Sequence, residues 1–313
     1  MTKQRVALPA PGAHGGDGAR VAAALGIEVA DVLDLSASLN PAAPDPGAIV
    51  AHHLAALGRY PDATRATAAL AEQLGVEPGR VVLTNGGAEA IALVGAIVGG
   101  VVDEPDFSLY PRTKTAPEQA RPPRWRSNPH SPSGQLAAPT DTAGVWDEAF
   151  WPMATTTWTR GDHRRGSVVV GSLTKLLACP GLRVGYVLAP ETDEGTRLLA
   201  AVRAAQPGWS VGGLVCEALP DLLDTVDLPG WHQEVVRLRR ELVDLLGTFG
   251  HQAVAADAPW VLVPNAGDLR GRLAPHAIVV RDCASFGLPN TVRIGVPNDA
   301  NRLRLAAVLG QIS

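Results

Sequence analysis

The 313-residue sequence has no excess of positive charge, because 27 lysines and arginines stand against 31 aspartates and glutamates, for a net charge of −4. A protein that binds the nucleic-acid backbone needs a basic surface that neutralises phosphates. We therefore expect no nucleic-acid partner.

Long apolar runs are also missing. The longest, from Ala90 to Val102, is interrupted by glycines and is far shorter than the roughly 20 residues that cross a bilayer. The first twelve residues hold no apolar stretch long enough for a signal peptide. The sequence therefore predicts no membrane segment and no export, and a buried helix entering a strand over 90–102.

Cysteines are few and widely spaced: Cys179, Cys216 and Cys283. An odd number at such spacing argues against a disulfide framework and against a metal site built from close ligand pairs. We expect no metal and a reducing, cytoplasmic setting.

Short apolar runs alternate with helical periodicity in the middle of the chain. Strands are predicted at 81–84, 144–146, 167–171 and 184–188, and helices near Pro46 and over 64–74 and 87–98. Continuous apolar strands separated by helices are typical of a parallel or mixed sheet buried on both faces.

The pattern changes after about residue 190 to longer helices, one with an apolar stripe at Trp231, Val235, Leu238, Leu242 and Leu245. Three more strands are predicted near Val261, Val279 and Val292, followed by a closing helix. We expect a large α/β domain over 46–200 and a smaller α+β domain over 201–313, joined by an N-terminal segment, 1–45, that wraps its surface.

The sharpest motif is Ser172-Leu173-Thr174-Lys175, followed by Pro180-Gly181-Leu182-Arg183-Val184-Gly185-Tyr186. Aldehyde chemistry needs a lysine that can be neutral and that lies beside a phosphate clamp, and Lys175 with Arg183 offers both. A surface lysine and arginine flanking a loop would be the alternative, but the extended motif makes that alternative weak.

This stretch resembles the fold-type I pyridoxal phosphate (PLP) enzymes, in the branch that holds histidinol-phosphate aminotransferases and threonine-phosphate decarboxylases. Further matching segments occur in the family's order at 33–41, 59–62, 85–91 and 147–150, so the resemblance covers nearly the whole chain from His14 onward. It implies a large α/β domain with a mixed, mostly parallel sheet and a smaller α+β domain.

The resemblance makes Lys175 the catalytic residue that forms the Schiff base with PLP. Gly86 and Gly87 open a helix after a strand, where main-chain N–H groups can hold the cofactor phosphate. The residues implied to hold the cofactor phosphate are Gly87, Ala88, Ser172 and Arg183.

Other cofactor contacts follow from the same resemblance. Asp147 would keep the pyridine nitrogen protonated, which makes the ring an electron sink. Phe107 matches the aromatic residue that covers the ring, with Tyr110 as the less favoured candidate. Ser131 stands where the family's asparagine donates to the cofactor's 3-oxygen. Tyr60 matches a residue that reaches the cofactor phosphate of the neighbouring subunit, so a homodimer with shared active sites is expected.

The residues implied to bind substrate are His14, Asn40, Arg281 and Arg293. Two arginines on adjacent strand patterns can grip carboxylate and phosphate by forked hydrogen bonds. The alternative is that both arginines lie on a solvent-exposed face and do not bind substrate. The implied substrate is a small phosphorylated amino acid or amine.

The sequence also departs from the family. Besides Ser131, Phe150 replaces a tyrosine and Ser38 an asparagine. Only 40 positions separate Phe107 from Asp147, about half of what the family uses there, and parallel crossovers need a dozen or more residues each. We expect at least one strand–helix unit to be missing.

Three segments favour a threonine-phosphate decarboxylase over a histidinol-phosphate aminotransferase: 14–17 (His-Gly-Gly-Asp), 207–211 (Pro-Gly-Trp-Ser-Val) and 281–283 (Arg-Asp-Cys). The choice depends on which α-carbon bond stands perpendicular to the cofactor plane. The aminotransferase stays open, as does a cofactor-binding regulator or scaffold with little activity.

Overall fold

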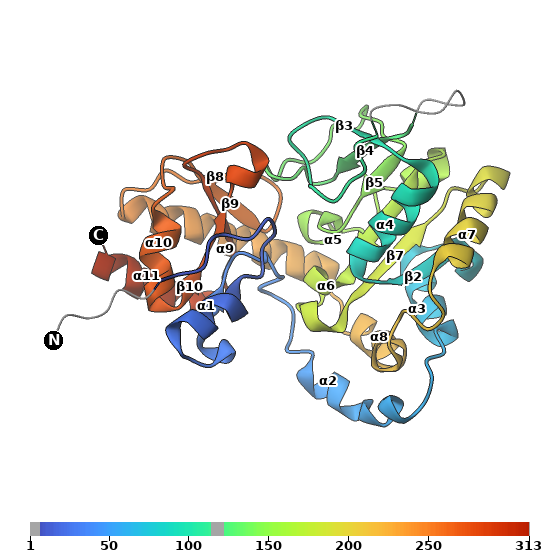
Figure 1. Cartoon of the computed structure of the whole chain (residues 1–313), viewed down its shortest axis with the longest axis horizontal. Helices are drawn as coiled ribbons and strands as arrows, with labels where there is room; N and C mark the ends of the chain where they lie inside the picture. Colours follow the sequence, from blue (N-terminus) through green and yellow to red (C-terminus); the bar gives the residue numbers. More distant parts are fainter. Residues whose placement is uncertain (1–6, 114–121, 313) are drawn as a thin grey trace. The chain divides into compact units, whose positions relative to one another are not determined.

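The structure is a computed structural model that describes residues 7–113 and 122–312. These residues form two compact units (Figure 1). Unit 1 comprises 7–42, 132–134 and 233–312, and unit 2 comprises 43–113, 122–131 and 135–232. Each unit is described separately below.

The core of unit 2 is a six-stranded mixed sheet in the order β2-β7-β6-β5-β4-β3. The strands are β2 (Val81–Asn85), β3 (Val101–Val102), β4 (Arg124–Ser127), β5 (Val145–Asp147), β6 (Val168–Ser172) and β7 (Val184–Leu188). β7 runs antiparallel to both of its neighbours, and the other pairs are parallel. This arrangement confirms the predicted mixed, mostly parallel sheet.

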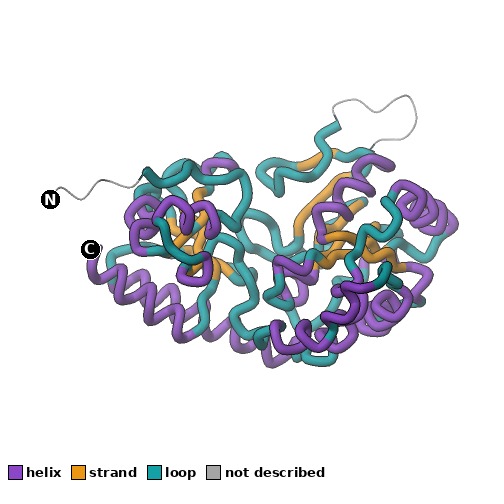
Figure 2. Tube along the Cα trace, turned by 60° about the horizontal axis from the view of Figure 1, so that its bottom comes forward, coloured by secondary structure: helices purple, strands orange, loops and turns teal. Residues whose placement is uncertain are grey.

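Helices enclose this sheet, as Figure 2 shows. α4 (Gly86–Val98) and α7 (Asp193–Ala205) share one hydrophobic core with the strands, and α3 (Thr64–Leu74) packs on α8 (Gly213–Leu223). The unit also contains α2 (Gly47–His52), α5 (Trp151–Ala154) and α6 (Leu173–Leu176). The predicted helix entering a strand over 90–102 is observed as α4 and β3, but α4 is buried on one face only, since Ala92 and Ile97 are exposed.

The connection from β3 to its parallel neighbour β4 runs over residues 103–123. Parallel strands are normally joined by a helical crossover, yet the described parts of this connection, 103–113 and 122–123, contain neither helix nor strand. Between Phe107 and β5 the described residues provide only one strand, β4. The described part therefore agrees with the prediction that a strand–helix unit is missing here.

Unit 1 contains a four-stranded antiparallel sheet in the order β11-β12-β9-β8. Its strands are β8 (Val254–Ala255), β9 (Trp260–Val263), β11 (Arg281–Asp282) and β12 (Val292–Gly295), and β1 (Leu33–Asp34) pairs separately with β10 (Ile278–Val279). Its helices are α1 (Gly18–Leu25), α10 (Leu269–Leu273), α11 (Asp299–Ile312) and most of α9 (Leu228–Thr248).

The apolar stripe of α9 is largely as predicted. Val235, Leu238 and Leu242 are buried, but Leu246 takes the core position that the sequence suggested for Leu245, which is only partly buried. A straight helix drifts relative to a strict repeat, so the last core position of the stripe shifts by one residue.

The N-terminal segment belongs to unit 1, where Leu33 and Leu35 enter the core. The boundary drawn from sequence at residue 200 differs from the observed one, which lies within α9 after His232. α7 shares the core of the unit 2 sheet and α8 packs on α3, which explains the difference. No helix of the described residues is long and apolar enough to cross a membrane.

Candidate active site

Polar residues occupy the carboxyl ends of three adjacent parallel strands in unit 2. Ser127 ends β4, Asp147 ends β5 and Ser172 ends β6, and the register pairs Ser127 with Asp147. In open α/β sheets, ligands bind outside this edge. The topology thus gathers the candidate cofactor residues at one edge of the sheet.

Asp147 is buried and hydrogen-bonded on both carboxyl oxygens. The Ala149 N–H donates to Oδ1 at 2.9 Å, and the Tyr110 hydroxyl donates to Oδ2 at 2.8 Å. Burial raises the pKa of Asp147, while these two donors and the positive charge of Lys175 oppose the increase. Lys175 therefore lies close enough to Asp147 to act on its charge.

Lys175 lies on α6, directly after β6. Its Nζ is 4.9 Å from the centroid of the Phe150 ring, and Phe150 follows Asp147 by three residues. An ammonium over an aromatic face is a favourable cation–π contact. The predicted lysine and aspartate therefore share one neighbourhood, with Phe150 beside them.

The start of α4 forms a candidate phosphate cup. Gly86 has φ +78°, and a Cβ there would overlap the Arg183 guanidinium; a Cβ on Gly87 would lie 3.1 Å from the Ser172 Cβ. A Cβ on Gly185 would likewise overlap the Gly86 backbone. The helix start, Ser172 and Arg183 therefore converge, and side chains are excluded where main-chain N–H groups must approach a ligand.

The other ring-side candidates are tied to one buried carboxylate, Asp106. It accepts hydrogen bonds from the N–H groups of Phe107 at 2.7 Å and Ser127 at 3.0 Å. The Ser127 hydroxyl also donates to Asp106 and accepts from the Ser131 N–H at 2.7 Å. Phe107 and Ser131 are thus held through the same acidic residue.

Tyr60 lies at the surface of unit 2. Its side chain is 78% exposed and its ring centroid is 4.7 Å from that of Trp209, which is 66% exposed. Leu54 and Leu57 are also exposed. Tyr60 is therefore accessible to a second subunit.

In unit 1, Arg281 and Arg293 are register partners on the antiparallel strands β11 and β12. Both side chains are buried, and neither forms an ion pair within the described residues. Arg281 stacks over Phe286 at 4.6 Å, and Arg293 stacks over Trp260 at 4.6 Å. The aromatic rings orient two positive charges without neutralising them.

Electrostatics at this pair favour an anion. Burial lowers the pKa of Arg293 to about 9, and the charge of Arg281 contributes. Burial also lowers the pKa of Arg281, and burial followed by the Arg281 charge lowers that of His14. The Arg281 guanidinium donates to the Ala13 carbonyl at 2.9 Å, so the N-terminal segment lies beside it.

Asn40, the remaining substrate candidate, is buried in unit 1. Its Oδ1 accepts a hydrogen bond from the Ala42 N–H at 3.0 Å. This bond closes a local turn.

The structure thus groups the cofactor candidates within unit 2 and the substrate candidates His14, Asn40, Arg281 and Arg293 within unit 1.

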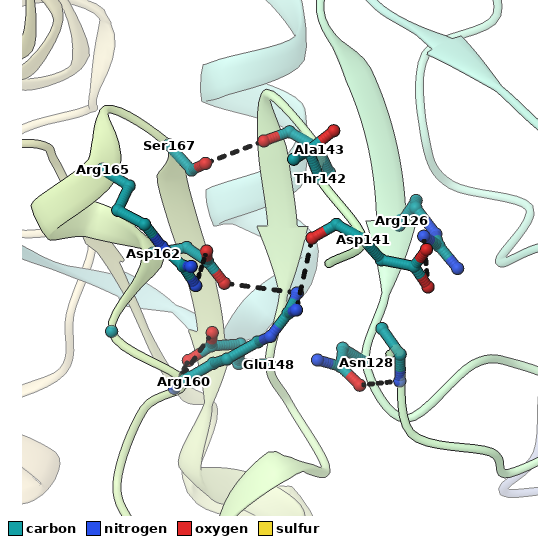
Figure 3. A network of polar contacts seen from close by, with 12 residues as sticks. Arg126, Asn128, Asp141, Thr142, Ala143, Glu148, Arg160, Asp162, Arg165 and Ser167 are labelled. Carbon is teal, nitrogen blue, oxygen red and sulfur yellow. Dashed lines mark hydrogen bonds and ion pairs between the residues drawn. The ribbon is translucent and has the colours of Figure 1, made fainter. Parts of the chain in front are cut away.

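Sequence reasoning missed a polar network next to Asp147, shown in Figure 3. Glu148 is buried and accepts bonds of 3.3 Å at each oxygen from the Arg160 N–H. Burial raises the pKa of Glu148 to about 8, although a side-chain hydrogen bond from Thr159 opposes the increase. The Arg160 guanidinium lies 4.6 Å from the centroid of the Trp146 ring and 3.3 Å from Asp162. Only the adjacency of Glu148 to Asp147 could have signalled this network.

Asp106 and Ser127 were also missed, because an isolated aspartate in a loop and an isolated serine at a strand end carry no distinctive sequence signal. Tyr110 was considered as a cover for the cofactor ring, but its hydroxyl instead bonds Asp147. Within the described residues no group of three or more potential acidic, histidine or cysteine ligands could hold a metal ion.

The residues of unit 2 fit PLP, the cofactor implied by the sequence resemblance. Main-chain donors, a serine hydroxyl and a guanidinium around Gly86 suit a phosphate monoester. A buried carboxyl suits a protonated ring nitrogen, and a lysine amine suits an aldehyde. The glycine positions let the Arg183 guanidinium and the Ser172 side chain approach the start of α4 closely.

Comparisons with known proteins also indicate a PLP-dependent enzyme. The sequence profile of the family described as aminotransferase class I and II matches residues 127–309. Histidinol-phosphate aminotransferase 1 of Dechloromonas aromatica (strain RCB) is 26% identical over 337 residues, which cover 91% of this chain and 91% of that protein.

Two solved structures share the fold. Histidinol-phosphate aminotransferase from Sinorhizobium meliloti, in complex with pyridoxal-5'-phosphate, has a TM-score of 0.76 at 16% identity, covering 100% of this chain and 99% of that one. L-threonine-O-3-phosphate decarboxylase from Porphyromonas gingivalis has a TM-score of 0.70 at 21% identity, covering 90% and 98%. The chain belongs to the aminotransferase class I and II family of PLP-dependent enzymes.

Proposed function

We propose that this enzyme acts on a phosphorylated amino acid, in a reaction similar to that of L-threonine-O-3-phosphate decarboxylase. The observation that carries this proposal is the buried pair Arg281 and Arg293, which forms no ion pair among the described residues, although the charges of Asp17 and Asp282 act on Arg281 from a greater distance. Burying charge that is only partly compensated is costly. An anionic substrate would compensate it.

The chemistry of the pair suggests which anions bind. A guanidinium forms two parallel hydrogen bonds with a carboxylate or a phosphate. Two guanidiniums held on adjacent strands therefore suit a substrate with two acidic groups. A phosphorylated amino acid has one carboxylate and one phosphate, and His14 beside Arg281 can add a donor.

Within unit 2, we assign cofactor binding to Lys175, Asp147 and the cup formed by Gly86, Ser172 and Arg183. When bound, PLP withdraws electrons from the substrate's α-carbon. Asp147 would hold the proton on the ring nitrogen. The Lys175 amine would hold the cofactor aldehyde and afterwards move protons at the substrate.

The second candidate is a histidinol-phosphate aminotransferase. It is favoured by the curated relatives, such as the Dechloromonas aromatica protein, which bear that name. The decarboxylase is favoured by the segments 14–17, 207–211 and 281–283. Both reactions need the same cofactor and an anion site. They differ in the α-carbon bond that is broken and in the amino acceptor that transamination also requires.

We further propose that the enzyme is a homodimer in which Tyr60 reaches the partner's cofactor phosphate. The support is a group of exposed apolar side chains in unit 2: Leu54, Leu57, Tyr60 and Trp209. Apolar side chains clustered at a surface mark contact sites for other proteins.

One pair of assays tests the reaction. The enzyme loaded with PLP is incubated with threonine phosphate, and aminopropanol phosphate is measured; separately it receives histidinol phosphate and 2-oxoglutarate, and glutamate is measured. Aminopropanol phosphate without glutamate supports the decarboxylase. Glutamate alone overturns it in favour of the transaminase, and neither product overturns both candidates.

A further inference from the structure

Asp147 owes its orientation to a residue far away in sequence. The Ala149 N–H that bonds Oδ1 belongs to the same turn as Asp147, whereas the hydroxyl that bonds Oδ2 comes from Tyr110. Both Tyr110 and Asp147 are buried. With a donor on each oxygen, the plane of the carboxylate is fixed, and it is the Tyr110 side chain that holds the second oxygen.

Tyr110 is itself tightly held. Its ring meets Phe107 edge-on, with centroids 5.6 Å apart, and lies 5.5 Å from the Trp125 ring. Its hydroxyl is also a hydrogen-bond neighbour of Ser127, whose own hydroxyl donates to Asp106. A row of buried groups therefore runs from Asp106 through Ser127 and Tyr110 to Asp147.

The charge of Asp147 needs this support. Burial favours the neutral carboxyl, and a neutral carboxyl cannot keep a ring nitrogen protonated. Lys175 opposes this effect while it is an ammonium, but its amine is the group assigned to the cofactor aldehyde. Burial, together with the charges of Asp147 and Asp106, raises the pKa of Tyr110 well above its usual value, so its hydroxyl stays a donor.

We propose that Tyr110 is a positioning residue that acts through Asp147, keeping this carboxylate charged and oriented for the ring nitrogen of PLP, while Asp106 and Ser127 hold Tyr110 in place. The inference rests on the assignment of Asp147 proposed above. It gives Tyr110 a different role from covering the cofactor ring.

The test compares Tyr110→Phe with the wild-type protein, using PLP and 1-deazapyridoxal phosphate, which has carbon in place of the ring nitrogen. Binding of each compound to the apo protein is measured by absorbance titration. Losing a hydrogen bond to a charged group should weaken PLP binding by about 10-fold or more. Binding of the deaza compound should change by less than about 2-fold, because Asp147 has no ring nitrogen to meet.

Equal losses for both compounds would overturn the proposal, since a merely structural role for Tyr110 affects them alike. A wild-type protein that binds both compounds equally would instead overturn the assignment of Asp147 itself. Tyr186→Phe is the matched control: Tyr186 is also buried, on strand β7 of the same sheet, and no bond from its hydroxyl to Asp147 occurs in the described part of the chain. Tyr186→Phe should leave the affinities for PLP and for the deaza compound within about 2-fold of the wild-type values.

A second measurement keeps the test decisive if Tyr110→Phe folds poorly. In an Asp147→Asn background, adding Tyr110→Phe should change PLP affinity by less than about 2-fold, because coupled residues give non-additive effects. Full additivity of the two substitutions would contradict the proposal. Thermal unfolding of each apo variant identifies any loss that comes from folding alone.

Discussion

Arg293 stacks over the indole of Trp260 at 4.6 Å, and the indole N–H of Trp260 donates to the Pro132 carbonyl at 2.9 Å. The indole is therefore fixed, and it fixes the guanidinium in turn. The proposed substrate class depends on the buried positive charge of Arg293.

Arg293→Lys should raise KM by about 100-fold, because an ammonium loses the forked geometry and the stacking. PLP affinity should stay within about 2-fold, since the cofactor candidates lie in unit 2. The measurements are steady-state kinetics with the active substrate and absorbance titration with PLP. Arg272→Lys, on α10 of the same unit, is the control. An unchanged KM would remove Arg293 from the substrate site.

Lys175→Ala should abolish the yellow colour of the protein loaded with PLP. In the wild-type protein, borohydride should fix the cofactor to one peptide. The sequence contains only three lysines, Lys3, Lys114 and Lys175, so mass spectrometry of the reduced digest identifies the site directly. Lys114→Ala should keep the colour. A label on either other lysine would refute the assignment.

Gly86→Ala should reduce PLP affinity at least 10-fold and destabilise the protein by about 1–2 kcal/mol, because an alanine at φ +78° is strained and its Cβ would overlap Arg183. Gly181→Ala is a matched control, since no atom lies within 4 Å of a Cβ there. PLP titration and thermal unfolding are the measurements. Equal affinities for the two variants would argue against the cup.

Glu148→Gln should change how stability depends on pH. The folded state holds the Glu148 proton up to a pKa of about 8, whereas the unfolded chain releases it near 4.5. Stability from the neutral carboxyl is therefore complete below pH 4.5 and is lost as pH rises through 8. The amide does not titrate, so the variant should gain stability relative to the wild type, on the order of 1–3 kcal/mol, between pH 5 and pH 8.5.

Chemical unfolding of the apo proteins at these two pH values measures this gain. Glu72→Gln, on the partly exposed helix α3, serves as the comparison for replacing a carboxylate by an amide. A difference between wild type and Glu148→Gln that is the same at both pH values would contradict the buried titration.

Leu57→Asp should weaken the proposed homodimer. Leu57 is 71% exposed in the single chain and lies in the exposed apolar group that includes Tyr60. A charge placed in an apolar interface is destabilising. Light scattering coupled to size exclusion should show a dimer for the wild type and a shift toward monomer for the variant, with Val254→Asp in unit 1 as the control. A monomeric wild type would contradict the proposal.

The sequence predicted the sheet of unit 2 well, because continuous apolar strands such as β6 and β7 are distinctive. It also predicted that Lys175 and Asp147 share a site, since both follow strand ends. It could not predict that Tyr110 bonds Asp147, because residues 37 positions apart meet only through the packing of Trp125 and Phe107. The boundary near residue 200 was misplaced because α8 pairs with α3, a contact between distant segments.

The pairing of β1 with β10 joins residues 33–34 to residues 278–279, and the short piece 132–134 is anchored to Ala258 and Trp260. Unit 1 is thus assembled from three separate stretches of chain. A single proteolytic cut cannot release it intact, and no truncation from either terminus yields it whole. Unit 1 can therefore complete its fold only after the segment 233–312 has been synthesised.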